Sequence, residues 1–289
     1  MLPWQETVVK HFGQAVLIPI AGGSLAASYE LRTNQGRYFL KYYDPATVYD
    51  SAITWRETSA LQALKQSGWP VPDVILSHDS CIVLSWIEHG SPNRRNAAGE
   101  ILGRILGKVH QHRADSYSLP WGNAIGVLQR PSEPYARGGD FYWLVRLLPL
   151  LEDLIPGFPF LREIIHWEQP IRNFLNHSIR HPTLVHGDLW SGNFLWRPDA
   201  SPFVIDPAGY FGDPVSDVAF AELFGGFPQT FYDCYWASFG RDEYYECKKP
   251  LYQLYHALVH LKLFGQSYWG LTQSLAEQIR HSPCLKGAE

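Results

Sequence analysis

The sequence predicts an α+β fold with two lobes, a small N-terminal β-sheet lobe and a larger, mostly helical C-terminal lobe. Alternating apolar and polar residues between glycine turns fill the first part of the chain, whereas apolar residues recur at helical spacing through most of the remainder. A short predicted hairpin interrupts the helical part and carries the most distinctive polar motif. The 289 residues, 46% of them hydrophobic, can build the cores of two modest lobes, which we expect at residues 1–88 and 89–289.

The N-terminal part predicts a three-stranded meander followed by its one main helix. Apolar runs and alternating segments lie between turn residues such as Asn34 and Gly36. Asp44 and Pro45 are a typical N-cap and first helical residue, so the helix is expected to begin there. The strands are expected at residues 16–20, 28–33 and 37–43.

The first turn of this meander contains Gly22, Gly23 and Ser24. Glycines let a backbone approach phosphate oxygens closely and direct its N–H groups at them, and the serine adds a hydroxyl. These residues are therefore candidates for a phosphate-binding loop. A Gly-Gly turn is also typical of a plain hairpin, and the full G-x-G-x-x-G pattern is absent from this segment.

Lys41 lies among large apolar residues on the third expected strand, where an ammonium group needs a partner. Glu57, Leu61 and Leu64 follow at helical spacing, which places the glutamate on the helix face toward the sheet. In kinases such a lysine–glutamate pair orients the lysine on the α- and β-phosphates of ATP. The alternative is a snorkelling lysine on an edge strand and a solvated glutamate.

An apolar strand at residues 81–87 leads into residues 88–92, where a hinge between the lobes is expected. Beyond the hinge the apolar period becomes helical. Pro149 and Pro170 are expected to interrupt two of the helices. Helices are expected over residues 102–112, 141–154, 161–179 and 251–264.

The most distinctive segment, residues 186–193, has the sequence HGDLWSGN. Its order His-x-Asp-x-x-x-x-Asn is the pattern of the catalytic loop of kinases. In that loop the aspartate receives the proton of the attacking hydroxyl, and the asparagine holds a magnesium ion. We therefore expect Asp188 to be the catalytic base, Asn193 to be a metal ligand and His186 to be a structural support.

Asp206 ends an apolar run thirteen residues after Asn193. Residues 194–196, 197–201 and 202–205 predict a strand, a turn and a returning strand, and this hairpin brings Asn193 and Asp206 side by side. One amide and one carboxylate are a suitable protein contribution to Mg²⁺, which also binds nucleotide phosphates. An Asx turn and two capping carboxylates would explain each residue singly, but not their order and spacing.

Charge and cysteine content argue against several other classes of protein. Charged residues make up 18% of the chain and the formal net charge is −4, so we expect no nucleic-acid partner and no membrane partner. The cysteines form no C-x-x-C pair, which argues against a zinc site and predicts ordinary thiols of a reduced compartment. The chain has no signal-peptide pattern and no apolar run of about 18 residues, so a cytoplasmic location is expected. The four cysteines are Cys81, Cys234, Cys247 and Cys284.

Three segments resemble the fructosamine kinase family, a branch of the protein-kinase-like fold that includes aminoglycoside and choline kinases. They are VHGDLWSGNFLW, VIDPAGYFGDPVSDVAFAELFGGF and PLYQLYHALVHLKLFG, and the resemblance covers nearly the whole chain. Its most specific parts are the insert at residues 189–192 within the catalytic loop and the segment at residues 206–227. The catalytic-loop pattern with a following Ile-Asp would by itself fit any small-molecule kinase of this fold.

Members of this family phosphorylate ketosamines, which are adducts of sugars with amines, usually on the O3 hydroxyl, and the phosphorylated adduct then falls apart. The resemblance therefore implies an ATP- and Mg²⁺-dependent kinase of a fructosamine or ribulosamine, free or on a protein lysine, that acts in deglycation. It also implies that Asp217 supports the catalytic loop from a helix start. Trp190 is the candidate for substrate contact, because an indole beside the base can stack on a sugar and attract an ammonium. Simple packing is the alternative for this tryptophan.

Two other functions stay open at this point. One is a kinase of another small alcohol, of the aminoglycoside or choline type. The other is a pseudokinase or scaffold that binds nucleotide without transferring phosphate, which the intact set of motif residues argues against. Many relatives carry a redox-active cysteine in the glycine-rich turn, whereas this chain has Ser24 there, so we expect no thiol control at that loop. The sequence predicts no particular oligomeric state.

Overall fold

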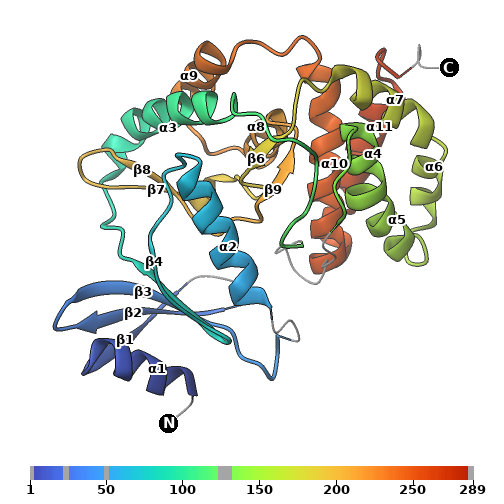
Figure 1. Ribbon diagram of the computed structural model, residues 1–289. Coiled ribbons are helices and arrows are strands. Elements are labelled where there is room, and N and C mark those ends of the chain that lie inside the picture. Colours follow the sequence, from blue (N-terminus) through green and yellow to red (C-terminus); the bar gives the residue numbers. More distant parts are fainter. Residues whose placement is uncertain (1–2, 22–25, 49–51, 123–131, 286–289) are drawn as a thin grey trace.

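An antiparallel five-stranded sheet forms the N-terminal lobe of the computed structural model (Figure 1). Its strand order is β1-β2-β3-β5-β4, so the predicted meander is confirmed and β4, which we had not predicted, adds an edge. The structure describes residues 3–21, 26–48, 52–122 and 132–285. The strands are β1 (Ala15–Ile20), β2 (Ala27–Thr33), β3 (Gly36–Tyr42), β4 (Val74–His78) and β5 (Cys81–Ser85).

Helices α1 (Pro3–Phe12) and α2 (Ile53–Gln66) cover opposite faces of this sheet (Figure 1). Successive side chains of a strand point to opposite faces, and on β5 Val83 joins the apolar cluster of α1 whereas Ile82 joins that of α2. Lys41 of β3 stands directly opposite Ile82 in the register, so its side chain points to the face that α2 covers. The sheet therefore directs the lysine toward the helix that carries its predicted partner.

Helix α2 begins later than the sequence predicts. Asp44 and Pro45 open a turn instead of a helix, since the amide of Ala46 donates to Asp44 Oδ1 at 3.0 Å and that of Val48 to the Asp44 carbonyl at 2.8 Å. The same short carboxylate satisfies an Asx turn as readily as a helix N-terminus, and this explains the error.

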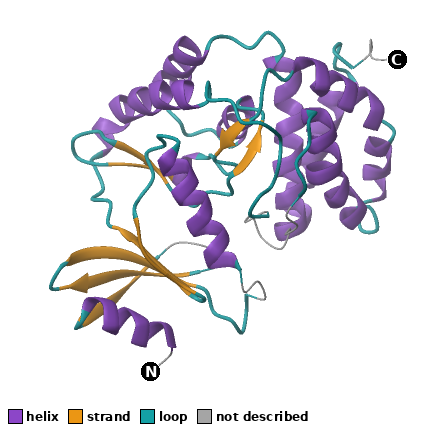
Figure 2. Cartoon of the chain, in the orientation of Figure 1, coloured by secondary structure: helices purple, strands orange, loops and turns teal. Residues whose placement is uncertain are grey.

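Helices make up most of the C-terminal lobe, around two short pairs of strands (Figure 2). β6 (Thr183–Val185) pairs with β9 (Tyr210–Gly212), and β7 (Phe194–Trp196) pairs with β8 (Pro202–Val204) as the predicted hairpin. The α-helices are α3 (Arg95–Val109), α4 (Gly138–Phe141), α5 (Leu148–Leu154), α6 (Arg162–Ile165), α7 (Glu168–Ser178), α8 (Val215–Leu223), α9 (Gln229–Phe239), α10 (Tyr245–Phe264) and α11 (Trp269–Arg280). The shorter helical segments are η1 (Pro92–Arg94), η3 (Pro159–Leu161), η4 (Ser191–Asn193), η5 (Gly265–Tyr268) and the π-helical η2 (Tyr142–Leu147).

Neither of the two prolines expected to interrupt helices breaks the helix that contains it. The π-helical η2 joins α4 to α5 without a break, and Pro149 lies at the start of α5. Pro170 is the third residue of α7. The break in that region falls at His166 and Trp167, between α6 and α7. The first turn of α7 accommodates Pro170 because the N–H groups there have no partner within the helix. Pro149 instead follows the π-helical η2 inside a continuous helical segment.

Two of the cysteines are not the free thiols that the sequence predicts. Cys247 in the first turn of α10 and Cys284 beyond α11 form a disulfide with a Cα–Cα distance of 6.3 Å. The prediction failed because α11 runs back along α10 and brings together residues 37 apart in the sequence, which no cysteine spacing reveals. Cys81 and Cys234 are free thiols.

We expect that opening this disulfide lowers the thermal stability of the protein. A crosslink across 37 residues restricts the unfolded chain, and a restriction of this size contributes roughly 2–4 kcal/mol to the free energy of unfolding. The midpoint of thermal unfolding should therefore be lower for Cys247→Ser than for the wild type or for Cys234→Ser. Reductant should lower the midpoints of the wild type and of Cys234→Ser, which both keep the disulfide, and leave that of Cys247→Ser unchanged. A wild-type midpoint that reductant leaves unchanged would contradict the prediction.

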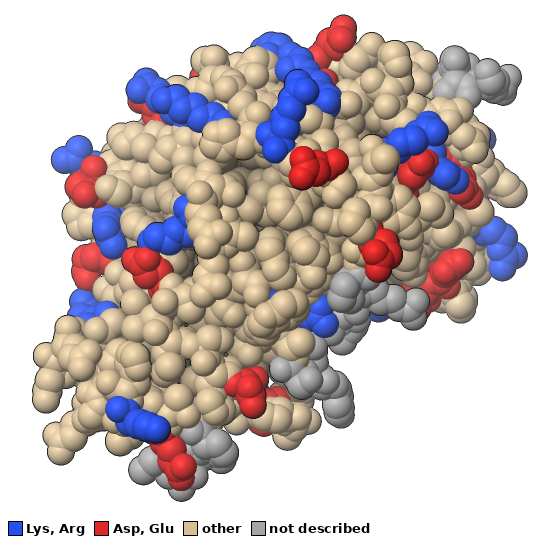
Figure 3. All heavy atoms as spheres, viewed as in Figure 1, with Lys and Arg blue, Asp and Glu red and all other residues tan. Residues whose placement is uncertain are grey.

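None of the helices within the described ranges combines the length and apolarity that a bilayer crossing requires. On the face shown in Figure 3, basic and acidic side chains are interspersed over the surface.

Candidate active site

The lysine and glutamate predicted to pair are in contact. The Lys41 side chain is buried, and its Nζ donates to Glu57 Oε1 at 2.7 Å and to Asp206 Oδ1 at 2.6 Å. Burial opposes the ammonium charge, but the carboxylates of Glu57 and Asp206 outweigh it and hold the pKa of Lys41 well above its usual range. Lys41 therefore carries a full positive charge between a residue of the N-terminal lobe and one of the C-terminal lobe.

Tyr43 is a member of this group that our sequence analysis missed. It lies two residues after Lys41, hence on the same side of the chain, and its hydroxyl donates to Glu57 Oε2. Burial and the negative charge of Glu57 raise the pKa of Tyr43 well above its usual range, so the phenol stays a neutral donor. Both oxygens of Glu57 are engaged, which fixes the glutamate toward Lys41. The alternation of side chains along a strand was the sequence signal that places Tyr43 on the same face as Lys41.

Asp188 and Asn193 face each other across the catalytic loop. Asn193 Nδ2 donates to the Asp188 carbonyl at 2.9 Å and to Asp188 Oδ2 at 3.0 Å. Since the nitrogen end of the amide is turned to Asp188, Asn193 Oδ1 is the end that can accept a cation. The amide of Ile205 donates to the Asn193 carbonyl at 3.0 Å, so the hairpin sets Asp206 beside Asn193 as predicted.

The pKa of Asp188 is raised toward neutral pH. Burial raises its pKa to about 7, and the charges of Asp206 and Asp217 add to the rise against the opposing hydrogen bond from Asn193. A carboxylate with a pKa near the working pH can accept a proton readily and release it again.

Asp217 holds the backbone of the catalytic loop from the first turn of α8. Its Oδ2 accepts from the amide of His186 at 2.7 Å, and its Oδ1 accepts from the amide of Gly187 at 2.8 Å. Gly187 has a positive φ of 77°, and a Cβ at this position would overlap the carbonyl of Ala208. Burial lowers the pKa of His186, so its imidazole is neutral. The Asp217 carboxylate and the close approach of Gly187 to the Ala208 carbonyl thus fix the two residues before Asp188.

Trp190, two residues after Asp188, is exposed, with 40% of its surface accessible. Its indole lies over Gly192, where an added Cβ would overlap the ring. This position does not match the packing alternative, because the side chain lies outside the apolar core of the lobe.

Gly22, Gly23 and Ser24 lie outside the described residues, so their role in a phosphate loop stays a prediction. The strands on either side of this segment are described. Ile20 at the end of β1 is opposite Ser28, and Ser28 is in turn opposite Lys41.

Asn193 and Asp206 carry side-chain oxygens of the kind that Mg²⁺ prefers, and Asp206 also pairs with Lys41. The described residues include no group of three or more His, Cys, Asp or Glu side chains that could hold a metal alone. Asn193 Oδ1 and the Asp206 carboxylate form instead a partial set of hard oxygen ligands, which nucleotide phosphates would complete. The Asp206 side chain remains 37% exposed despite its ion pair, and its backbone has a positive φ of 57°. Such backbone strain is typical of functional positions.

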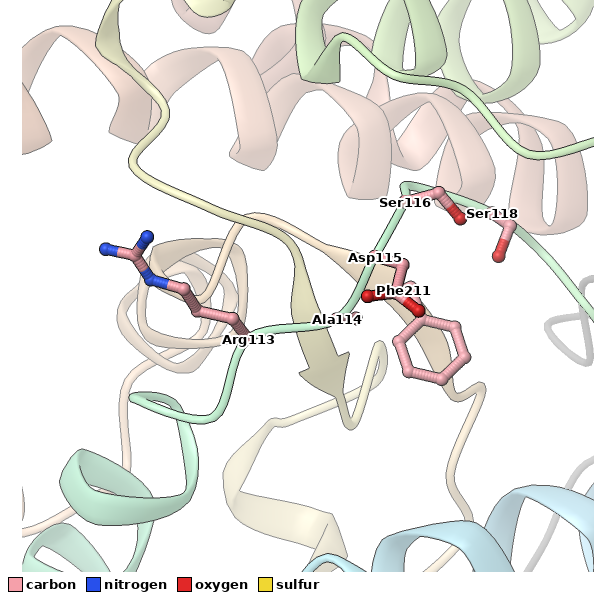
Figure 4. Close-up of a pocket in the computed structure, with 6 residues that line it drawn as sticks. All are labelled: Arg113, Ala114, Asp115, Ser116, Ser118 and Phe211. Carbon is pink, nitrogen blue, oxygen red and sulfur yellow. The ribbon is translucent and has the colours of Figure 1, made fainter.

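A separate pocket of about 270 Å³ lies beside β9 (Figure 4). It contains none of the residues predicted for the site. Its lining consists of Arg113, Ala114, Asp115, Ser116, Ser118 and Phe211.

Comparisons with known proteins identify the family of the chain. A model of the fructosamine kinase family matches residues 3–282. A probable ketoamine kinase of Synechocystis sp. is 30% identical over 298 residues, which cover 96% of this chain and 96% of that protein. A Thermobifida fusca crystal structure, assigned as a fructosamine-3-kinase, matches with a TM-score of 0.86 and 26% identity over 96% of this chain and 98% of that one.

A more distant match extends the fold assignment. A choline kinase of Streptococcus pneumoniae gives a TM-score of 0.63 at 15% identity, over 96% of this chain and 98% of that one. At this identity the match shows the fold alone, and it confirms the two-lobed, protein-kinase-like architecture. Because the family model matches nearly the whole length of the chain, the chain belongs to the fructosamine kinase family of ATP-dependent phosphotransferases.

Proposed function

We propose that the protein transfers the γ-phosphoryl group of ATP to the O3 hydroxyl of a ketosamine, a fructosamine or a ribulosamine, and acts in deglycation. The observation that carries the proposal is the convergence of Lys41 and Glu57 from one lobe with Asp188, Asn193 and Asp206 from the other. The substrate class follows from the family and from relatives described as probable ketoamine kinases. The acceptor is a small ketosamine or a glycated lysine of a protein.

In this proposal the protein positions the reactants and neutralises charge. The acceptor oxygen forms a bond to the γ-phosphorus as the bond to the bridging oxygen of ADP breaks, and Asp188 receives the hydroxyl proton. Lys41, oriented by Glu57, binds the α- and β-phosphates, and the turn containing Gly22, Gly23 and Ser24 covers them.

Asn193 and Asp206 would hold Mg²⁺, which supplies further positive charge at the phosphates when it is bound. His186 and Asp217 support the loop that presents the base. Such support is expected, because phosphoryl transfer depends on an accurate approach of the acceptor oxygen to the γ-phosphate.

We also propose a boundary between the lobes at residues 88 and 89. β5 ends at Ser85, and the amide of Gly90 already donates to the carbonyl of Trp196 in the hairpin at 2.6 Å. A cytoplasmic location stays a prediction, as does the oligomeric state.

Trp190 is proposed to contact the sugar of the acceptor, and Gly192 provides a test. A Cβ at Gly192 would displace the indole, so Gly192→Ala should raise KM for the ketosamine by about tenfold, the cost of roughly 1.4 kcal/mol of lost binding. KM for ATP should stay within about twofold of the wild type, since the nucleotide binds elsewhere. Steady-state kinetics check both values. Gly270→Ala, at a helical glycine with open space around it, is the matched control. An unchanged acceptor KM would remove Trp190 from the substrate site.

An acceptor panel tests the proposed substrate class. ADP release is measured with Mg-ATP and fructosyl-lysine, ribulosyl-lysine, erythrulosyl-lysine, an aminoglycoside or choline. Turnover confined to the ketoamines is the expected result. Turnover with only the aminoglycoside or choline would contradict the proposal and favour another small-alcohol kinase. Nucleotide binding with no turnover of any acceptor would favour a pseudokinase.

A further inference from the structure

We infer that Lys248 of α10 is a positioning residue for the phosphoryl transfer. It lies outside the catalytic motif, but a continuous series of polar contacts joins it to the backbone beside Asp188. The inference rests on the proposed function, in which Asp188 is the base that the loop must present accurately.

The ammonium of Lys248 lies wholly inside the protein. Its side chain is 0% exposed, and Nζ lies 3.0 Å from Asp213 Oδ2 and 2.9 Å from Asp242 Oδ2. Both aspartate side chains are 2% exposed. The hydroxyl of Tyr252, one turn further along α10, donates to the same Asp213 Oδ2 at 2.7 Å. Buried charges of this kind persist only where opposite charges and hydrogen bonds compensate them.

Asp242 connects Lys248 to the start of its own helix. The amide of Tyr244 donates to Asp242 Oδ1 at 2.9 Å, just before α10 begins. Lys248 therefore links two helix starts, that of α10 through Asp242 and that of α8 through Asp213. Lys248 holds both carboxylates, so a change at this residue acts directly on the first turn of α8.

Asp213 fixes that first turn. Its Oδ1 accepts from the amide of Val215 at 3.2 Å, as the side chain of a helix cap does. Its carbonyl accepts from the amide of Ser216 at 3.0 Å and from the Ser216 hydroxyl at 2.7 Å. The ion pair with Lys248 thus sets the carboxylate around which α8 starts.

The next residue of α8, Asp217, contacts the catalytic loop. Its carboxylate receives the amides of His186 and Gly187, and Asp188 is the following residue. Every link from Lys248 to Gly187 is a hydrogen bond or ion pair of 3.2 Å or less, or a step along the first turn of α8. A shift of this turn would move the Asp217 carboxylate and loosen both amides.

The test measures the loop directly and does not depend on turnover. We would compare Lys248→Met with Lys262→Met, a change of the same type on the same helix at a more exposed lysine that pairs with Asp153. Amide hydrogen exchange at His186 and Gly187 should be about tenfold faster in Lys248→Met and unchanged in Lys262→Met. kcat should fall by about 10- to 100-fold in Lys248→Met with KM for ATP within about twofold. Lys248→Arg, which keeps the charge, should recover kcat to within about threefold of the wild type.

The opposite result is equally defined. A Lys248→Met protein that melts earlier but keeps wild-type kcat and wild-type exchange at these amides would show that the lysine is only structural, and would overturn the inference. If Lys248→Met does not fold, Tyr252→Phe replaces it, because this change removes one hydrogen bond to Asp213 and keeps the ring. Its exchange and kcat should change in the same directions, and wild-type values for both would overturn the inference. Amide hydrogen exchange tests the role of Lys248 even if no ketosamine is turned over. Failure of this inference is therefore distinguishable from failure of the proposed function.

Discussion

Replacement of Asp188 by asparagine is expected to lower kcat by about 10² to 10⁴, the usual contribution of a positioned base. The amide cannot accept the hydroxyl proton, whereas its oxygen can still accept from Asn193 Nδ2, which contacts Asp188 Oδ2 at 3.0 Å in the wild type. The loop backbone should also stay in place, because Asp217 holds the amides of His186 and Gly187. KM for ATP should therefore change by no more than about twofold.

Steady-state kinetics with a ketosamine acceptor measure both constants. Asp199→Asn is the matched control, since Asp199 lies in the turn of the β7–β8 hairpin and accepts from the nearby Ser201 amide at 2.9 Å. The control should have wild-type kcat. Unchanged turnover in Asp188→Asn would remove the assignment of this residue as the base.

Replacement of Asp206 by asparagine is expected to act on the metal. The exposed part of the carboxylate is the charged oxygen ligand proposed for Mg²⁺, and its loss should raise the Mg²⁺ concentration for half-maximal turnover by at least about tenfold. Lys41 keeps its 2.7 Å contact with Glu57, so the phosphate-binding lysine should stay in position. The loss of turnover in Asp206→Asn should be smaller at high Mg²⁺ concentration.

A titration of turnover against Mg²⁺ at saturating ATP makes this measurement. Glu57→Gln provides the contrast, because the loss of its charge weakens the orientation of Lys41 and should raise KM for ATP with little change in the Mg²⁺ requirement. An Asp206→Asn protein with the wild-type dependence on Mg²⁺ would contradict the metal role.

Local patterns were enough to predict much of the site. The pairing of Lys41 with Glu57 and the approach of Asn193 to Asp206 each depend on one strand and its neighbouring element, so residue spacing determines them. The error at Asp44 shows the limit of such patterns, since one carboxylate suits a turn and a helix cap equally well.

The parts that the sequence did not predict depend on contacts between distant segments. The disulfide of Cys247 with Cys284 requires the return of α11 along α10, and the ion pair of Lys248 with Asp213 requires the packing of α10 on α8. Neither has a local pattern, because the partners are separated by whole helices. α1 is different, since Trp4, Val8 and Phe12 recur every four residues and form one apolar helix face that our sequence analysis overlooked.

The most direct test of the central claim is to locate the transferred phosphate. The protein would be incubated with Mg-ATP and fructosyl-lysine, and the fresh reaction examined by phosphorus NMR with coupling to the sugar protons. One phosphoester on O3 is expected for each ADP formed, and no detectable ester is expected from Asp188→Asn in the same incubation time. ADP accompanied only by inorganic phosphate, or an ester on another hydroxyl, would contradict this expectation.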